Sequence, residues 1–202
     1  ICGPMTSVSG AVFQTFTRER PVPIGVMVGH SAGEVSDEME TVDNEDIATF
    51  TATFANGSVG TFSVSRVAHG MPNALAFEVT AERGSAAYDL TRPGEFTFSD
   101  QGPAGVVNGP RQVLLGPAHP YMERSLPMDF PSVGHGQNDF FAWQAAAFLD
   151  QVAGLDRLPA VPSLQHGLHN MEILGAVTQP ALNGGQAVPL ACRRHFHPHT
   201  HR

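Results

Sequence analysis

The sequence contains no lysine: the eleven residues counted as lysine or arginine are all arginines. Schiff-base chemistry and proton transfer through a lysine ammonium group are therefore excluded for these 202 residues. The formal net charge is −8, and a surface that follows nucleic-acid phosphates needs clustered basic residues that are missing here. No apolar run reaches the length of about 18 residues that a membrane span requires. We therefore expect neither a nucleic acid nor a membrane as partner.

Cysteine is also scarce, with Cys2 and Cys192 near opposite ends of the chain. One possible pair makes a poor disulfide framework, which favours a reduced, cytoplasmic setting. Both cysteines lie in end segments without a paired base, so we interpret them as spectators, and no Gly-x-Ser-x-Gly motif supports hydrolase chemistry. The chain starts at Ile1 with no initiator methionine and no basic stretch before an apolar segment, so we expect a piece cut from a longer protein.

The first two thirds of the chain have the pattern of β-strands. Residues 46–54 alternate, with phenylalanine and alanine on one face and mostly threonine on the other. Asn56-Gly57 favours a tight hairpin turn, so residues 59–68 should return antiparallel. The other expected strands are 5–17, 74–81, 85–90, 95–99 and 112–115.

The last third changes to helical spacing. One helix should end near Gly154, and a second should run from the N-cap Ser163 to Asn183, with Pro180 kinking or shortening it. The apolar stripe expected on the first helix consists of Phe141, Ala145, Phe148 and Val152. Strands followed by helices, without alternation, indicate an α+β domain: a largely antiparallel, open-faced sheet with helices packed on one face.

The two faces of this sheet are expected to have different neighbours. The side chains expected to pack between sheet and helices are Phe50, Phe54, Phe62 and Val64 against Phe141, Phe148, Leu168 and Leu174. The opposite face would carry Thr49, Thr51, Thr53, Ser63, Ser65 and Val67. These residues are neither charged enough for a solvated face nor apolar enough for a second core layer. They predict a two-fold homodimer packed sheet to sheet.

Two clusters of possible metal ligands have simpler interpretations. Asp43, Glu45 and Asp46 lack the spacing of a calcium loop, so we interpret them as a solvated strand entrance. The tail 192–202 is rich in histidine and unlike the remainder, and we expect it to be disordered. Its alternating histidines, which could hold Zn²⁺ or Ni²⁺ adventitiously, are His195, His197, His199 and His201. We predict no functional metal site.

Several segments, in order, resemble one known family. They include Asp43-Asn44-Glu45-Asp46 before a strand, 54–61 around the Asn-Gly turn, Glu82-Arg83-Gly84-Ser85, Gly134-His135-Gly136 before a helix, and 162–168 at the start of the last helix. Together they resemble the C-terminal domain of the glucose–fructose oxidoreductase, inositol dehydrogenase and MocA family. The resemblance covers about residues 1–190 and also implies a closing strand at Val188 and Leu190.

The resemblance implies a parent NAD- or NADP-dependent oxidoreductase that acts on a sugar, inositol or related polyol. Residues 1–191 would be its substrate-side and dimerisation domain. The family's Rossmann domain, Gly-rich dinucleotide fingerprint and catalytic lysine would lie outside this sequence, so the chain alone should be inactive and bind no cofactor. The alternative is a non-enzymatic sheet module for dimerisation or small-ligand binding.

Substrate hydroxyls need hydrogen-bond donors and acceptors at strand ends and in irregular loops. The residues that meet this description are Arg66, His69, Asn73, His119, Tyr121, His135 and Asn138. Each could instead be a solvated loop residue or a locally bonded turn residue. His135 is the best supported, because it lies inside a segment that resembles the family.

Overall fold

A computed structural model describes residues 2–26, 33–71, 73–100, 109–125 and 135–190. They divide into two compact units. The first unit comprises residues 1–69 and 164–202, and the second comprises residues 70–163. The histidine-rich tail 192–202 lies outside the described residues. None of the described helices combines the length and the apolar character that a membrane span requires.

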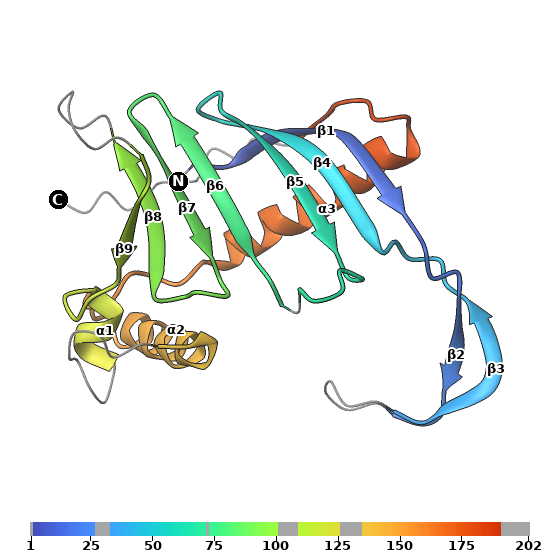
Figure 1. The fold of residues 1–202 in the computed structure, drawn as a ribbon, viewed down its shortest axis with the longest axis horizontal. Helices are drawn as coiled ribbons and strands as arrows, with labels where there is room; N and C mark the ends of the chain where they lie inside the picture. Colours follow the sequence, from blue (N-terminus) through green and yellow to red (C-terminus); the bar gives the residue numbers. More distant parts are fainter. Residues whose placement is uncertain (1, 27–32, 72, 101–108, 126–134, 191–202) are drawn as a thin grey trace. The chain divides into compact units, whose positions relative to one another are not determined.

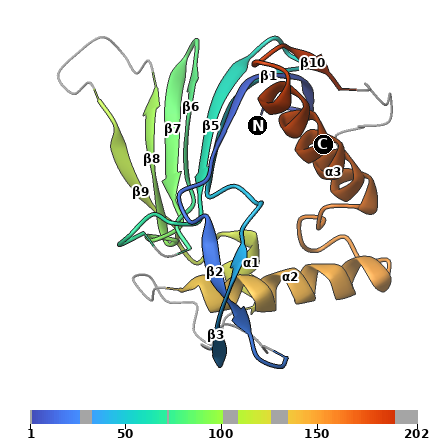
Figure 2. The same cartoon turned by 90° about the vertical axis from the view of Figure 1, so that its right-hand side faces the viewer.

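The first unit is an antiparallel sheet covered on one face by a helix (Figure 1). Its strands are β1 (Met5–Gln14), β4 (Ile47–Phe54), β5 (Val59–Ser65) and β10 (Val188–Pro189), in the order β10-β1-β4-β5. The helix is α3 (Leu164–Leu182), which packs on β1 (Figure 2). Phe50 lies opposite Phe62 and Thr51 opposite Thr61, so the predicted hairpin and its alternation are confirmed.

The core of the first unit joins β1 to small residues of α3. Its buried members are Val8, Ala11, Ala176, Val177 and Leu190, with Phe50 and Ile173 packed against them. Leu168 and Leu174, the helix residues expected here, are exposed, and Leu174 keeps 61% of its surface. That prediction was wrong because small side chains let the helix approach the sheet closely, and the inward face is the one with Ala176. Pro180 is fully buried within α3, two residues before the helix ends.

The second unit begins with a four-stranded meander, as the turn residues predict. Its strands are β6 (Ala76–Ala81), β7 (Gly84–Asp89), β8 (Glu95–Asp100) and β9 (Arg111–Leu114), each antiparallel to the next. Position 84 requires a glycine, because a Cβ atom there would lie 2.1 Å from the carbonyl oxygen of Ser99. The predicted α+β class with antiparallel strands is confirmed, although the strands form three sheets and not the single sheet expected.

Two helices complete the second unit, α1 (Pro120–Ser125) and α2 (Gln137–Val152), which contact each other. The side of α2 that is buried carries Trp143, Ala147 and Asp150. The predicted stripe is wrong, because its members are exposed, Phe141 to 70%. Apolar residues lie on both sides of this helix, so periodicity alone could not decide which side faces inward. Trp143 and an ion pair between Asp150 and Arg157 decide it.

A third, two-stranded sheet was not predicted. Its strands are β2 (Glu19–Pro23) and β3 (Val35–Thr41), which pair only with each other among the described strands. We call this hairpin the arm. The sequence concealed it because two prolines in β2 and a run of acidic residues in β3 are unfavourable in strands.

One carboxylate holds the base of the arm to the sheet of the first unit. Asp46 is only 2% exposed, which corrects its interpretation as a solvated residue. Its Oδ2 accepts the backbone N–H groups of Phe16 and Thr17, each at 2.8 Å, and its Oδ1 lies 3.5 Å from the Arg20 guanidinium. These backbone hydrogen bonds, aided by the arginine, lower the pKa of Asp46 below its usual value. The carboxylate is therefore ionised at neutral pH.

We predict that Asp46→Asn lowers the melting temperature by about 5 °C or more, because an amide replaces a buried acceptor of several hydrogen bonds. Asp43→Asn, at an exposed position of the same loop, is the control and should change it little. Because folding lowers the Asp46 pKa, its stabilisation exists above the unfolded pKa of about 4 and disappears as pH falls through the folded value. Thermal melts from neutral to acid pH measure both effects. Equal melting curves for the two variants would contradict the role given to Asp46.

Candidate functional site

Five ring side chains of the second unit meet where α1, α2 and the turn before β8 come together. We call His119, Tyr121, His135, Phe140 and Trp143 the ring cluster. Ring centroids are 5.8 Å apart for His119 and Tyr121, 5.9 Å for Tyr121 and Trp143, 4.9 Å for His135 and Trp143, and 5.4 Å for Phe140 and Trp143. Three of the seven predicted substrate-binding residues are therefore brought together.

The start of α2 fixes the position of His135. Asp139 accepts the backbone N–H of Gly136 at 2.7 Å, which closes the first helical turn. His135 precedes this cap and packs against Phe140, with ring centroids 5.8 Å apart, in the arrangement of a hydrophobic staple. Its Nε2 lies 3.0 Å from the carbonyl oxygen of Pro93, so in the neutral ring this nitrogen donates. The other ring nitrogen, Nδ1, is then an acceptor.

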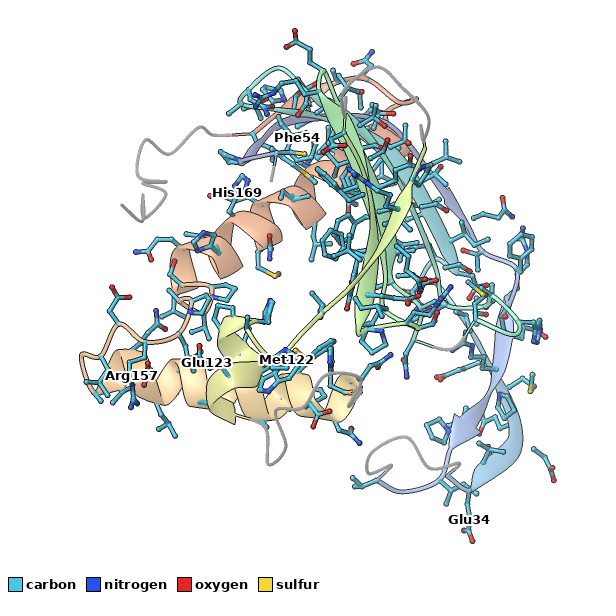
Figure 3. All side chains as sticks on the ribbon, turned by 60° about the vertical axis from the view of Figure 1, so that its left-hand side comes forward. Glu34, Phe54, Met122, Glu123, Arg157 and His169 are labelled. Atoms are coloured by element: carbon cyan, nitrogen blue, oxygen red, sulfur yellow. The ribbon has the colours of Figure 1, made fainter. Side chains whose placement is uncertain are left out.

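The start of α1 holds the other two polar rings. His119 precedes Pro120, whose missing N–H suits the first position of a helix. Tyr121 donates its hydroxyl to the carbonyl oxygen of Pro159 at 3.2 Å. Met122 in the same helix is buried and is labelled in Figure 3, on the helix that contacts α2. His119 and Tyr121 thus lie next to the buried Met122 in the chain, in the helix that contacts α2.

Three nitrogen atoms of the ring cluster are buried and have no hydrogen-bond partner among the described residues. They are Nδ1 of His119, Nδ1 of His135 and Nε1 of Trp143. An unsatisfied buried polar atom costs about 1–3 kcal/mol, so three in one cluster require an explanation. The indole N–H can only donate, whereas Nδ1 of His135 can accept. The described residues thus leave at least one donor and one acceptor of the ring cluster without a partner.

Burial lowers the pKa of His119 below its usual value, and the neighbouring His135 lowers it further. His119 is consequently neutral at physiological pH. A neutral ring has one donor and one acceptor nitrogen, and it can hydrogen-bond an uncharged ligand without the desolvation cost of a cation.

The other four predicted site residues do not join the ring cluster. Asn138 is exposed in the first turn of α2, and Asn73 is exposed in a turn with a φ of 50°. Arg66 and His69 are exposed in the first unit. Sequence reasoning missed Trp143 as a member, although its place one turn after Phe140 was a usable signal. No group of three or more possible metal ligands occurs among the residues that the structure describes.

We predict that protonation of His119 destabilises the fold. Because folding lowers its pKa, stability is complete above the unfolded value of about 6.5 and falls as pH drops below it toward the folded value. Melting temperatures at about pH 7.5 and about pH 5.5 should therefore differ, and His119→Gln should reduce that difference by about 1–2 °C. His69→Gln, at an exposed position, is the matched control. An unchanged difference in His119→Gln would contradict the prediction.

Comparison with known proteins identifies the class. No family model matches the chain. In structure, the chain matches an NAD binding oxidoreductase from Klebsiella pneumoniae with a TM-score of 0.79 at 23% identity, over 94% of this chain and 46% of that one. An oxidoreductase domain protein from Kribbella flavida matches with a TM-score of 0.75 at 30% identity, over 92% and 46%.

In sequence and fold the chain thus matches part of oxidoreductases of the glucose–fructose oxidoreductase, inositol dehydrogenase and MocA type. The resemblance found in the sequence is confirmed, and it fits the C-terminal domain. The relative matched in sequence is levoglucosan dehydrogenase of Pseudarthrobacter phenanthrenivorans, 32% identical over 144 residues. Those residues are 67% of this chain and 36% of that protein. The chain thus spans about half the length, or less, of the relatives it matches.

Proposed function

We propose that residues 1–191 are the substrate-side and dimerisation domain of an NAD(P)-dependent oxidoreductase acting on a sugar, inositol or related polyol. The observation that carries the proposal is the ring cluster, with its three buried nitrogen atoms that have no partner among the described residues. Support comes from levoglucosan dehydrogenase, whose solved structures include a complex with NADH and levoglucosan and another with NADH and L-sorbose. The cytoplasmic location stays part of the proposal.

In this proposal the ring cluster binds one edge of the substrate. Nδ1 of His135 accepts a hydrogen bond from a substrate hydroxyl, because Nε2 donates to the carbonyl oxygen of Pro93. The indole N–H of Trp143 donates to a hydroxyl oxygen. His119 forms a hydrogen bond with a further hydroxyl group, as donor or as acceptor according to its tautomer.

The nicotinamide cofactor accepts or donates hydride in such a reaction, but these residues do not fit it. Dinucleotide binding uses a strand, a Gly-rich turn and a helix N-terminus in succession, and the sequence contains no Gly-x-Gly-x-x-Gly. We therefore assign this chain the binding and orientation of the substrate alone. The exposed Arg66, His69, Asn73 and Asn138 stay candidates for outer substrate contacts.

The only tryptophan of the sequence, Trp143, lies in the ring cluster and makes a direct test possible. We predict that levoglucosan, L-sorbose or myo-inositol changes its fluorescence saturably. His135→Leu should weaken this binding at least about tenfold, because a hydroxyl then loses its acceptor. NADH should show no saturation in the micromolar range in a calorimetric titration.

The control for this titration is His166→Gln, which changes a histidine of α3 in the first unit and should leave the response unaltered. A response that is linear in sugar concentration would contradict the substrate site. Equal affinities of the wild type and His135→Leu would contradict the role of His135. Tight binding of NADH would contradict the proposal that this chain binds the substrate and not the cofactor.

The dimer part of the proposal depends on the face of the β4–β5 hairpin opposite Phe50. Thr51 and Thr61 lie directly opposite each other there, and Thr49 lies opposite Ser63. This face carries hydroxyl groups and no charged side chain along the paired residues. Such a face can be buried against a copy of itself at little desolvation cost.

We predict a dimer of twice 21.5 kDa in light scattering, and a monomer after Thr51→Arg, because an arginine at the centre would be buried without a partner. Thr80→Arg, at an exposed position of β6 in the second unit, is the control and should stay dimeric. A wild type that stays monomeric at high concentration would refute the dimer. A dimeric Thr51→Arg would refute the assigned face.

A further inference from the structure

Three Asn-Gly pairs occur in the sequence, Asn56-Gly57, Asn108-Gly109 and Asn183-Gly184. Such a pair can modify itself, because a glycine has no Cβ atom to shield its backbone nitrogen. That nitrogen attacks Cγ of the asparagine and forms a bond to it, while the bond from Cγ to Nδ2 breaks and ammonia leaves with the glycine N–H proton. Water then opens the cyclic imide at either carbonyl and gives aspartate or isoaspartate. Asn108 lies outside the described residues.

The turn between β4 and β5 restrains the first pair. Oδ1 of Asn56 accepts the Ser58 N–H at 3.0 Å and the Ser58 hydroxyl at 2.6 Å. The Gly57 N–H donates to the Phe54 carbonyl at 2.9 Å. Hydrogen bonds of the hairpin therefore hold both reacting groups, and attack on Cγ requires the turn to open first.

The last pair lies just after α3, in the loop that leads to β10, and its two residues are exposed. Among the described residues, neither the Asn183 carboxamide nor the Gly184 N–H forms a hydrogen bond. The hydrogen bonds of this loop use other groups, since the Asn183 N–H lies 3.1 Å from the Gln179 carbonyl and the Gly185 N–H donates to the Pro180 carbonyl at 2.7 Å. Rotation of the Asn183 side chain toward the Gly184 nitrogen thus breaks no hydrogen bond to a described residue.

We propose that Asn183 deamidates spontaneously and that this modification loosens the closing strand β10. The Gly185 carbonyl accepts the Gly10 N–H of β1 at 2.9 Å, and three residues later Val188 pairs with Val8. Isoaspartate carries the main chain through its Cγ, so it adds a methylene group ahead of Gly185 and displaces this contact. Either product also places a carboxylate next to the C-terminus of α3, where the helix dipole disfavours negative charge.

Ageing of the purified full chain tests the site. The protein is kept in mildly alkaline buffer, and samples taken over time are digested and analysed by peptide mass spectrometry for aspartate and isoaspartate. We expect several times more product at position 183 than at position 56, and a melting temperature lower by about 2 °C or more in the aged sample. Asn183→Gln is the matched variant and should keep its melting temperature, because a glutamine forms the cyclic imide far more slowly.

Two controls separate the structure from the local sequence. In urea the two positions should react at similar rates, because the hydrogen bonds of the hairpin are lost. Ser58→Ala removes one bond to the Asn56 carboxamide and should raise the product at position 56 while position 183 stays unchanged. As much product at position 56 as at position 183 in the folded wild type would overturn the proposed site. Equal losses of melting temperature in aged wild type and aged Asn183→Gln would overturn the effect on β10.

Discussion

Asp46 joins β1, β4 and the base of the arm through hydrogen bonds of its side chain and its backbone. Its side chain accepts hydrogen bonds from the end of β1, its N–H donates to the Gln14 carbonyl at 2.9 Å, and its carbonyl accepts from Arg66 at 3.0 Å. A single buried residue therefore sets where β1 stops, where β4 starts and how the arm leaves the sheet. Because the acceptor is charged and buried, its loss cannot be compensated by solvent.

The ring cluster is held by similar means, with polar contacts at the edges of an apolar centre. Hydrogen bonds to Pro93 and Pro159 orient His135 and Tyr121, and the capping carboxylate of Asp139 fixes the helix that carries Trp143. The backbone groups are thus satisfied while ring nitrogens stay without partners among the described residues. Side chains held in this way would lose little entropy on binding the proposed substrate.

Turn chemistry and alternation predicted most of the strands, because Asn56-Gly57 and the period of two depend only on local geometry. Which face of each helix is buried was not predictable, since residues 137–152 and 164–182 each carry more than one apolar stripe. The arm and the burial of Asp46 depend on long-range hydrogen bonds, which leave no local pattern. Within the site, His119, Tyr121 and His135 were found from their positions in loops, whereas Trp143 was missed because only loop and strand-end residues were considered.

The apolar residues on two sides of α2 have a consequence for how its sequence can vary. Trp143 and Ala147 face the interior of the second unit, and their replacement would disturb folding. Phe141 and Phe148 face outward, where polar replacement leaves that interior intact. If these outward positions stay aromatic among relatives, the reason must be a contact that the side chains make outside this unit. Comparing their variation with that of Trp143 and Ala147 would therefore distinguish residues kept for folding from residues kept for assembly.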